Sequence, residues 1–195
     1  MSDGRDLLLV AGIGLLAYAA WNAAGGSNNS GLSGENVTSN GPPLDDATLA
    51  ALAQQAYDTF SVRPELILAD IQQESGGDPS AVGDGGRAIG LMQMHAAAAS
   101  DVGVNWSDLA GNPELQVLAG THYLRLQLDR FGGDERTALI AYNQGASVAA
   151  NPSDPRYATG ARYADAVLAR VASATIISNP ASSPSSTILD PSGYL

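Results

Sequence analysis

The stretch PELILADIQQESGG, residues 64–77, decides the fold because it contains the apolar spacing of one helix together with signals for both of its ends. Ile67, Ile71 and Glu74 follow the i, i+4, i+7 spacing of a single helix face, and Pro64 stands at a favourable first helical position. Two glycines soon after Glu74 end the helix. Burial and the negative pole of the helix dipole both disfavour a charged carboxyl group there. The pattern therefore predicts a raised pKa for Glu74, as a general acid requires, although a solvated surface glutamate is the plainer alternative.

Three short motifs occur in a fixed order along the chain: ES at 74–75, GLMQ at 90–93 and AYNQG at 141–145. In this order and at these separations they resemble the soluble lytic transglycosylase (SLT) family, which shares the goose-type lysozyme fold. The resemblance runs from about Leu44 to Val171. It implies a mostly α-helical, lysozyme-like domain that cleaves the β-1,4 bond between N-acetylmuramic acid and N-acetylglucosamine in peptidoglycan, leaving a 1,6-anhydro end.

The resemblance also assigns roles around the acid. Glu74 is expected to be the single catalytic acid and base. By analogy with the family, Tyr142 should donate a hydrogen bond to Glu74, while Ser75 and Asn143 should contact the substrate or the neighbours of the acid. Without the analogy, Tyr142 would be equally well explained as a core aromatic.

A second group of residues is expected to bind the glycan, with Met92 as an apolar floor and Gln93 offering its amide to the N-acetyl groups. Tyr163 resembles the aromatic residue of the family's last helix that lines the cleft, and a packing role explains it nearly as well. The predicted substrate-binding set is Gly90, Leu91, Met92, Gln93 and Tyr163.

Two other functions stay open at this stage. Glycosidases normally use two carboxyl groups, and either Asp78 or Asp84 in the loop after the Glu74 helix could activate water, as in goose-type muramidases, with Asp84 as the candidate second acid. The other alternative is an inactive glycan-binding or structural module of a virion or secretion apparatus. The product of peptidoglycan digestion distinguishes the three functions.

Composition excludes several classes of function. The formal net charge is -11, and all nine basic residues are arginines, so a nucleic-acid groove is not expected. The chain has no cysteine and only two histidines, and its residues indicate neither a metal site nor a cofactor. His122 falls on an apolar helical stripe, which favours packing over catalysis. Arg87 is a loop cation that either meets a peptide-stem carboxylate or is solvated.

The N-terminus contains the apolar run LLLVAGIGLLAYAAW at 7–21, extended to residue 24. This length is close to the lower limit for a single transmembrane helix, and a signal peptide is the alternative. Asp3 and Asp6 flank the lone Arg5, which favours an uncleaved anchor because a signal peptide begins with net positive charge. The distribution of arginine then places the catalytic domain outside the cytoplasm, in the periplasm. A place in a phage particle is the alternative.

Composition divides the chain into four parts: an anchor at 1–24, a Gly/Ser/Asn linker at 25–43, the catalytic domain at 44–174 and a Pro/Ser-rich tail at 175–195. The expected partners are glycan strands, a membrane reached through residues 7–24, and a virion or secretion complex. Within the domain, apolar periodicity and caps predict helices at about 46–60, 64–74, 94–102, 113–131, 134–143 and 156–174. Residues 76–90 are expected to form a long irregular loop.

Overall fold

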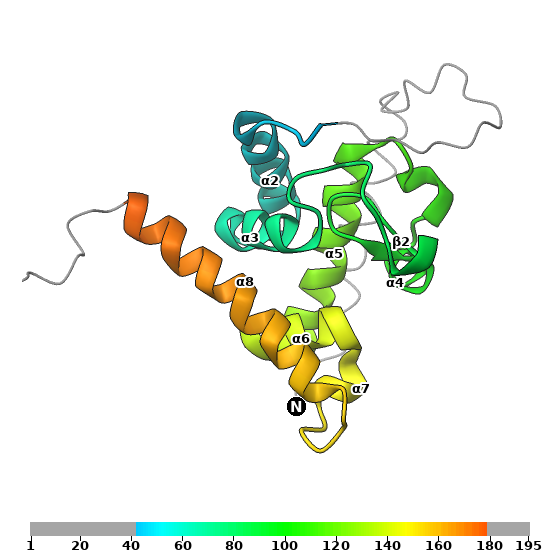
Figure 1. Cartoon of the computed structure of the whole chain (residues 1–195), viewed down its shortest axis with the longest axis vertical. Coiled ribbons are helices and arrows are strands. Elements are labelled where there is room, and N and C mark those ends of the chain that lie inside the picture. The colour runs from blue at the N-terminus through cyan, green and yellow to red at the C-terminus, as the bar shows by residue number, and fades with distance from the viewer. Residues whose placement is uncertain (1–41, 179–195) are drawn as a thin grey trace, which may run out of the picture.

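The computed structural model describes residues 42–178, and helices make up most of this part of the chain (Figure 1). Their bounds are α2 (Asp46–Phe60), α3 (Pro64–Glu74), α4 (Ala96–Asp101), α5 (Pro113–Arg130), α6 (Glu135–Gln144), α7 (Ala146–Ala149) and α8 (Tyr157–Ser178). Two 3-10 turns add η1 (Asp84–Gly86) and η2 (Trp106–Leu109). The prediction of a mostly α-helical domain is confirmed.

Side-chain caps explain why several of these helices begin where the sequence predicts. Asp45 accepts a hydrogen bond from the backbone N–H of Thr48 at 2.7 Å, and Asp134 does the same for Thr137 at 2.6 Å. Asn112 caps α5, and Pro64 occupies the first turn of α3. Each cap satisfies a backbone donor that the helix leaves free, so these helix starts are encoded locally.

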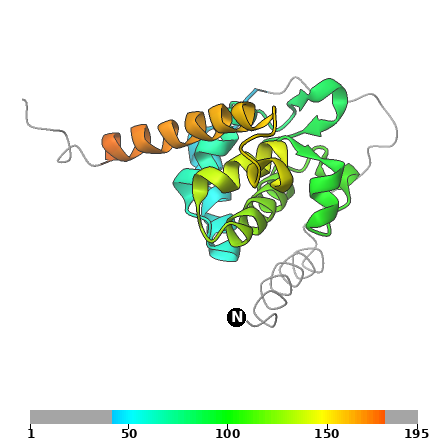
Figure 2. The same cartoon turned by 90° about the horizontal axis from the view of Figure 1, so that it is seen from below.

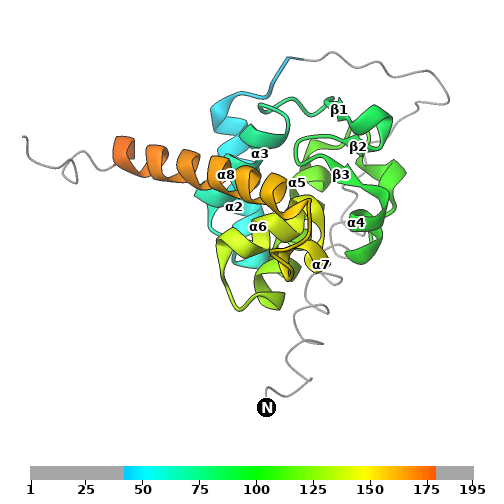
Figure 3. The same cartoon turned by 60° about the horizontal axis from the view of Figure 1, so that its bottom comes forward.

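The main core lies where α2, α3, α5, α6 and α8 meet. Leu66, Ile67 and Ile71 of α3 are buried in it, together with Leu139 and Ile140 of α6. Helix α8 packs against both α3 and α6, and Figure 3 shows it crossing in front of them. This packing brings the end of α3 beside the N-terminal half of α8, although the two are far apart in sequence.

A small antiparallel sheet lies on the other side of α5 from α8 (Figure 3). Its strands are β1 (Val82–Gly83), β2 (Ala88–Ile89) and β3 (Met94–His95), paired in that order with Val82 opposite Ile89 and Ile89 opposite Met94. The expectation of an irregular loop at 76–90 is therefore wrong in part, as is a helix beginning at Met94. Strands of two residues are too short to produce a period-2 pattern in the sequence.

A second, smaller core joins this sheet to the first half of α5. It contains Met94, Val102, Val104, Leu109 and Leu115. The indole N–H of Trp106 in η2 donates to the carbonyl of Met94 at 2.6 Å, which fastens the end of the sheet to this core. Segment 76–112 thus forms a lobe with apolar contacts of its own.

Helix α8 extends beyond the other helices at its C-terminal end, as Figure 2 shows. The predicted anchor, most of the linker and most of the tail lie outside the described residues. Within residues 42–178, no helix has both the length and the apolar character required to cross a membrane.

Candidate active site

Glu74 is the last residue of α3, where the chain turns toward the small sheet. One carboxyl oxygen, Oε1, accepts a hydrogen bond of 2.6 Å from the hydroxyl of Tyr163 on α8. Burial raises the pKa of Glu74 to about 7, while the Tyr163 hydrogen bond acts in the opposite direction. Because Glu74 keeps part of its surface exposed, it combines access to a substrate with a pKa suited to proton transfer near neutrality.

A second carboxyl group lies one helical turn before Glu74, at Asp70. Asp70 is completely buried, and its Oδ1 atom lies within hydrogen-bond distance of the same Tyr163 hydroxyl. Burial, and then the charge of Glu74, raise the pKa of Asp70 to about 8. None of the three sequence motifs includes this residue. Its i, i+4 spacing from Glu74 on the apolar face of the helix was the available signal.

Tyr163 connects α8 to both carboxyl groups. Burial is the main cause that raises its pKa well above the usual value, followed by the charges of Asp70 and Glu74. The phenol therefore stays protonated and acts as a hydrogen-bond donor at the site. The sequence predicts that Tyr163 either lines the cleft or packs in the core. The structure adds a third role, a direct hydrogen bond to the carboxyl group of Glu74.

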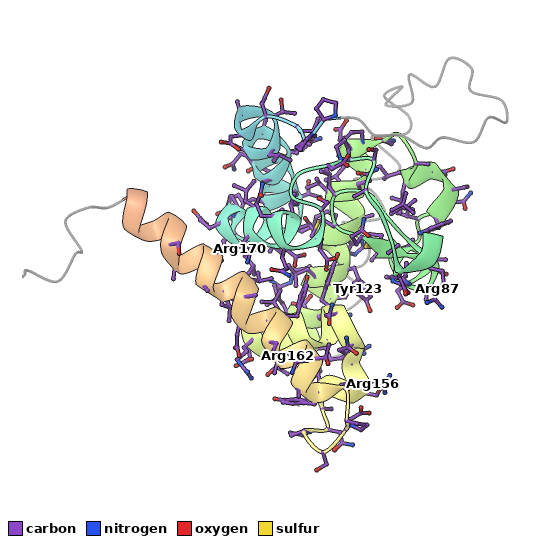
Figure 4. All side chains as sticks on the ribbon, viewed as in Figure 1. Arg87, Tyr123, Arg156, Arg162 and Arg170 are labelled. Atoms are coloured by element: carbon purple, nitrogen blue, oxygen red, sulfur yellow. The ribbon has the colours of Figure 1, made fainter. Side chains whose placement is uncertain are left out.

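The expected hydrogen bond from Tyr142 to Glu74 is not formed. The hydroxyl of Tyr142 donates instead to the carbonyl oxygen of Met92, at 2.8 Å. Its ring packs at a tilt against Tyr123, labelled in Figure 4, with 5.4 Å between the ring centroids. Tyr142 is therefore placed to hold the GLMQ segment, and Tyr163 takes the contact with Glu74 that the family analogy assigned to Tyr142.

Ser75 also holds the GLMQ segment in place. Its hydroxyl lies 2.9 Å from the carbonyl oxygen of Leu91 and 3.1 Å from that of Ile71, and it accepts a hydrogen bond from Gly77 N–H. No hydrogen bond joins Ser75 to the carboxyl group of Glu74 in the described part of the chain. Its contacts fit a role in fixing the end of α3 against the loop.

Gln116 is a buried residue of α5 that the sequence analysis did not assign to the site. Its Oε1 accepts a hydrogen bond from Leu91 N–H at 2.9 Å, and its Nε2 donates to the carbonyls of Pro79 and Leu109 at 3.0 and 2.8 Å. A side chain at Gly90, which has a positive φ of 79°, would overlap Gln116. Gln116 thus determines both the path of the loop and the need for glycine beside it.

The other side chains of the GLMQ segment face the protein. Leu91 and Met92 are completely buried, and Met92 packs against Gly120, so Met92 is a core residue and not an open apolar floor. Gln93 donates its amide to the carbonyls of Ala81 and Gly90, at 3.0 and 2.9 Å. Glycan binding by this segment stays a prediction, with the backbone as its candidate surface.

Asp84, the candidate second acid, lies in an exposed turn with a positive φ of 49°. Its carboxylate binds the guanidinium of Arg87 at 2.7 Å and lies 3.6 Å from Nε2 of His95. Arg87 is therefore engaged within its own loop, on the other side of the molecule from Arg170 of α8 (Figure 4). Asp84 belongs to an exposed ionic cluster, and no hydrogen bond links it to Glu74 within residues 42–178.

The structure places the other predicted residues as follows. Asn143 is exposed at the end of α6, where its side chain accepts a hydrogen bond from Gln144 at 2.7 Å. His122 is buried and stacks on Phe60 with 4.8 Å between ring centroids, which confirms the predicted packing role. Burial lowers the pKa of His122, so its ring stays neutral. In the part of the chain that the structure describes, no three acidic or histidine side chains gather in a way that could hold a metal ion.

Comparison with known families agrees with the resemblance seen in the motifs. A family model described as "Transglycosylase SLT domain" matches residues 51–163, more than half of the chain. This range contains all three motifs and ends at Tyr163.

Individual relatives share about a third of the aligned residues. The chain is 33% identical over 110 residues to the invasion protein IagB of Salmonella typhimurium, covering 53% of this chain and 68% of that protein. It is 34% identical over 113 residues to the peptidoglycan transglycosylase gp16 of Escherichia phage T7, covering 56% of this chain but only 8% of that protein. An endo-type membrane-bound lytic murein transglycosylase A from Citrobacter koseri is 37% identical over 83 residues, covering 38% of this chain and 40% of that protein.

A solved structure supports the fold. An inactive mutant of the lytic transglycosylase Slt from Pseudomonas aeruginosa matches with a TM-score of 0.54 and 20% identity. The match covers 67% of this chain and 24% of that one. The lysozyme-like fold expected from the motifs is thus supported by shape as well as by sequence.

Proposed function

The chain belongs to the transglycosylase SLT domain family, and from this membership we propose that it cleaves the β-1,4 bond between N-acetylmuramic acid and N-acetylglucosamine in peptidoglycan. The observation that carries the proposal is Glu74, a partly exposed carboxyl group whose pKa is raised to about 7 and which accepts a hydrogen bond from Tyr163. A carboxyl group in this state can give a proton to a leaving oxygen and take one back within a single reaction.

In the proposed reaction, Glu74 first protonates the glycosidic oxygen as its bond to the muramic acid breaks. The N-acetyl group of that sugar assists departure. The sugar's own 6-hydroxyl then closes the anhydro ring, and its proton returns to Glu74. One carboxyl group is sufficient, because the 6-hydroxyl takes the place of the water that a hydrolase would activate.

The surroundings of the nearby carboxyl groups support this reaction over inverting hydrolysis. An inverting hydrolase needs a second carboxylate that activates water on the opposite face of the sugar ring. Asp70 is completely buried behind Tyr163, and Asp84 is bound to Arg87. Burial keeps Asp70 from water, no hydrogen bond joins Asp84 to Glu74 within residues 42–178, and Asp78 accepts hydrogen bonds from Ser80.

The mature enzyme is proposed to act on the wall from outside the cytoplasm, anchored through residues 7–24 and spaced from the membrane by residues 25–43. The apolar run and the linker composition support this arrangement.

Membership of a virion or a secretion complex is the related proposal about partners. We expect the full-length protein to fractionate with membranes or with an assembled particle, and a variant starting at Pro43 to be soluble and active. A truncated protein that does not fold would contradict this division of the chain.

Mass spectrometry of digested peptidoglycan tests the reaction. The proposal predicts anhydro-muropeptides from the wild-type protein and none above background from Glu74→Gln. Products with reducing ends would indicate hydrolysis. A folded wild-type protein that gives no products would indicate a glycan-binding or structural module.

A further inference from the structure

One hydroxyl group serves two carboxyl groups at the end of α3. The Tyr163 oxygen lies 2.6 Å from Oε1 of Glu74 and within hydrogen-bond distance of Oδ1 of Asp70. A phenol has a single proton to donate, and a carboxylate can only accept. Both contacts are hydrogen bonds only if one of the carboxyl groups carries a proton and donates it to the Tyr163 oxygen.

Burial shows which carboxyl group keeps the proton. Asp70 is completely buried, whereas Glu74 is partly exposed. The second oxygen of Asp70, Oδ2, has no hydrogen-bond partner among residues 42–178. Leaving a neutral carbonyl oxygen unpaired costs much less than leaving part of a buried negative charge unpaired. Burial is the largest cause of the raised pKa in both groups, and the charge of Glu74 raises the pKa of Asp70 further.

The groups that face Asp70 provide no compensating positive charge. The titratable groups that interact with it electrostatically are Glu74 on its own helix, Tyr163 on α8 and Tyr142 on α6. The residues of α2 buried in the shared core are Leu49, Ala53 and Ala56, which are apolar. Across residues 42–178, no arginine or histidine forms an ion pair or a hydrogen bond with Asp70. An ionised Asp70 would therefore compete with Glu74 for the Tyr163 proton without any cation to stabilise it.

We propose that Asp70 is a positioning residue that stays protonated at neutral pH and donates its proton to the Tyr163 oxygen, which commits the single proton of Tyr163 to Glu74. The proposal rests on the proposed function only in naming Glu74 as the acid. Asp70 itself does not touch the substrate. Its neutral state also removes a like charge from beside Glu74 when Glu74 becomes a carboxylate during the reaction.

The pH dependence of kcat/KM for Asp70→Asn and Asp70→Leu tests this role on isolated peptidoglycan. The asparagine amide still donates to the Tyr163 oxygen and is neutral, so Asp70→Asn should keep activity within about threefold and leave the alkaline limb in place. Leucine cannot donate, so Asp70→Leu should lose roughly tenfold and move the alkaline limb to higher pH, since the Tyr163 bond that lowers the Glu74 pKa is weakened. Gln127→Leu, another buried polar residue replaced by leucine, is the matched control and should leave the limb unchanged.

Two kinetic outcomes would overturn the proposal. If Asp70 is ionised, Asp70→Asn removes a negative charge beside Glu74 and moves the alkaline limb to lower pH. If Asp70 only fills space, both substitutions leave the limb in place, and Asp70→Leu changes stability alone.

Carbon-13 NMR of the aspartate and glutamate carboxyl groups gives a measurement that does not depend on activity. The resonance that disappears in Asp70→Asn should stay at the position of a protonated acid from pH 5 to pH 7. A resonance at the carboxylate position over this range would contradict the proposal even in an active enzyme. Since this readout needs no substrate, a protein that cleaves nothing but shows a protonated Asp70 would reject the proposed function and leave the carboxyl pair as described.

Discussion

The two sides of the site are held by different kinds of contact. On the side of α3 and α8, titratable side chains bond to one another, since Tyr163 contacts both Glu74 and Asp70. On the side of the small sheet, neutral side chains bond to the backbone, as Gln116 and Tyr142 do with Leu91 and Met92. The first set of contacts changes with protonation and the second does not. The comparison indicates that contacts between α3 and α8 set the pKa of Glu74. Contacts on the side of the small sheet fix the path of the GLMQ segment.

Glu74→Gln should have the largest effect of any single substitution, because the amide keeps the packing and loses the transferable proton. Activity should fall by roughly 10²–10⁴-fold at every pH, which is the contribution of a positioned general acid. Glu65→Gln, an exposed substitution on the same helix, is the matched control and should leave activity unchanged. A folded Glu74→Gln protein with turnover near that of the control would place the acid elsewhere.

Gln116→Leu should destabilise the loop beside the small sheet, because it removes the side chain that binds the loop backbone. It leaves the N–H of Leu91 and the carbonyl of Pro79 without partners and removes one of the two donors to the Leu109 carbonyl, so the free energy of unfolding should fall by roughly 2–5 kcal/mol in chemical denaturation. Gln127→Leu is the control, since its buried Oε1 has no hydrogen-bond partner in the part of the chain that the structure describes, and it should change stability by about 1 kcal/mol or less. Equal losses from the two substitutions would show that the Gln116 hydrogen bonds do not hold the loop.

Tyr163→Phe and Tyr142→Phe compare the two sides directly, since each removes one hydroxyl. Tyr163 lowers the pKa of Glu74, so its loss should raise that pKa and move the alkaline limb of kcat/KM to higher pH. The rate at the optimum should fall roughly ten- to a hundredfold, as expected for one orienting bond of ~1.5–3 kcal/mol to a charged group.

Tyr142→Phe should instead reduce stability by about 1 kcal/mol, the value of one neutral hydrogen bond, and leave the limb in place. Kinetics over pH 5 to 9 and denaturation of both variants check the contrast. A shifted limb in Tyr142→Phe, or an unshifted one in Tyr163→Phe, would reverse the assignment of the two tyrosines.

Asp84→Asn should have the smallest effect. The side chain belongs to an exposed cluster with Arg87 and His95, and exposed ion pairs contribute about 0–1 kcal/mol. Most activity should remain, with anhydro products throughout. A loss comparable to that of Glu74→Gln, together with reducing-end products, would indicate an inverting hydrolase.

The helical side could be predicted from sequence because its signals are local. Pro64, the cap at Asp45 and the cap at Asp134 fix helix starts within a few residues, and the apolar spacing gives the buried faces. The sheet side could not be predicted, because its strands are two residues long and are held by side chains distant in sequence. Gln116 is 25 residues from Leu91, and no pattern within the loop itself indicates that contact.

The position of the acid was predictable, but its partner was not. Glu74 was identified by helical spacing and by the following glycines, and the direction of its pKa shift agrees with the structure. The partner depends on how α6 and α8 pack, which places Tyr163 at the carboxyl group and turns Tyr142 toward Met92. Asp70 is not predicted to belong to the site, because it lies on an apolar helix face, where a hydrophobicity pattern treats a polar residue only as a mismatch.

The central claim is that one partly exposed carboxyl group, Glu74, performs both proton transfers while the sugar's own 6-hydroxyl replaces water. Digestion of peptidoglycan in water enriched in oxygen-18, followed by mass spectrometry of the released muropeptides, tests it most directly. The account predicts anhydro products that contain no solvent oxygen, with the wild-type enzyme and with Asp84→Asn alike. Oxygen-18 in the new sugar ends would show that water is the nucleophile and would contradict the account.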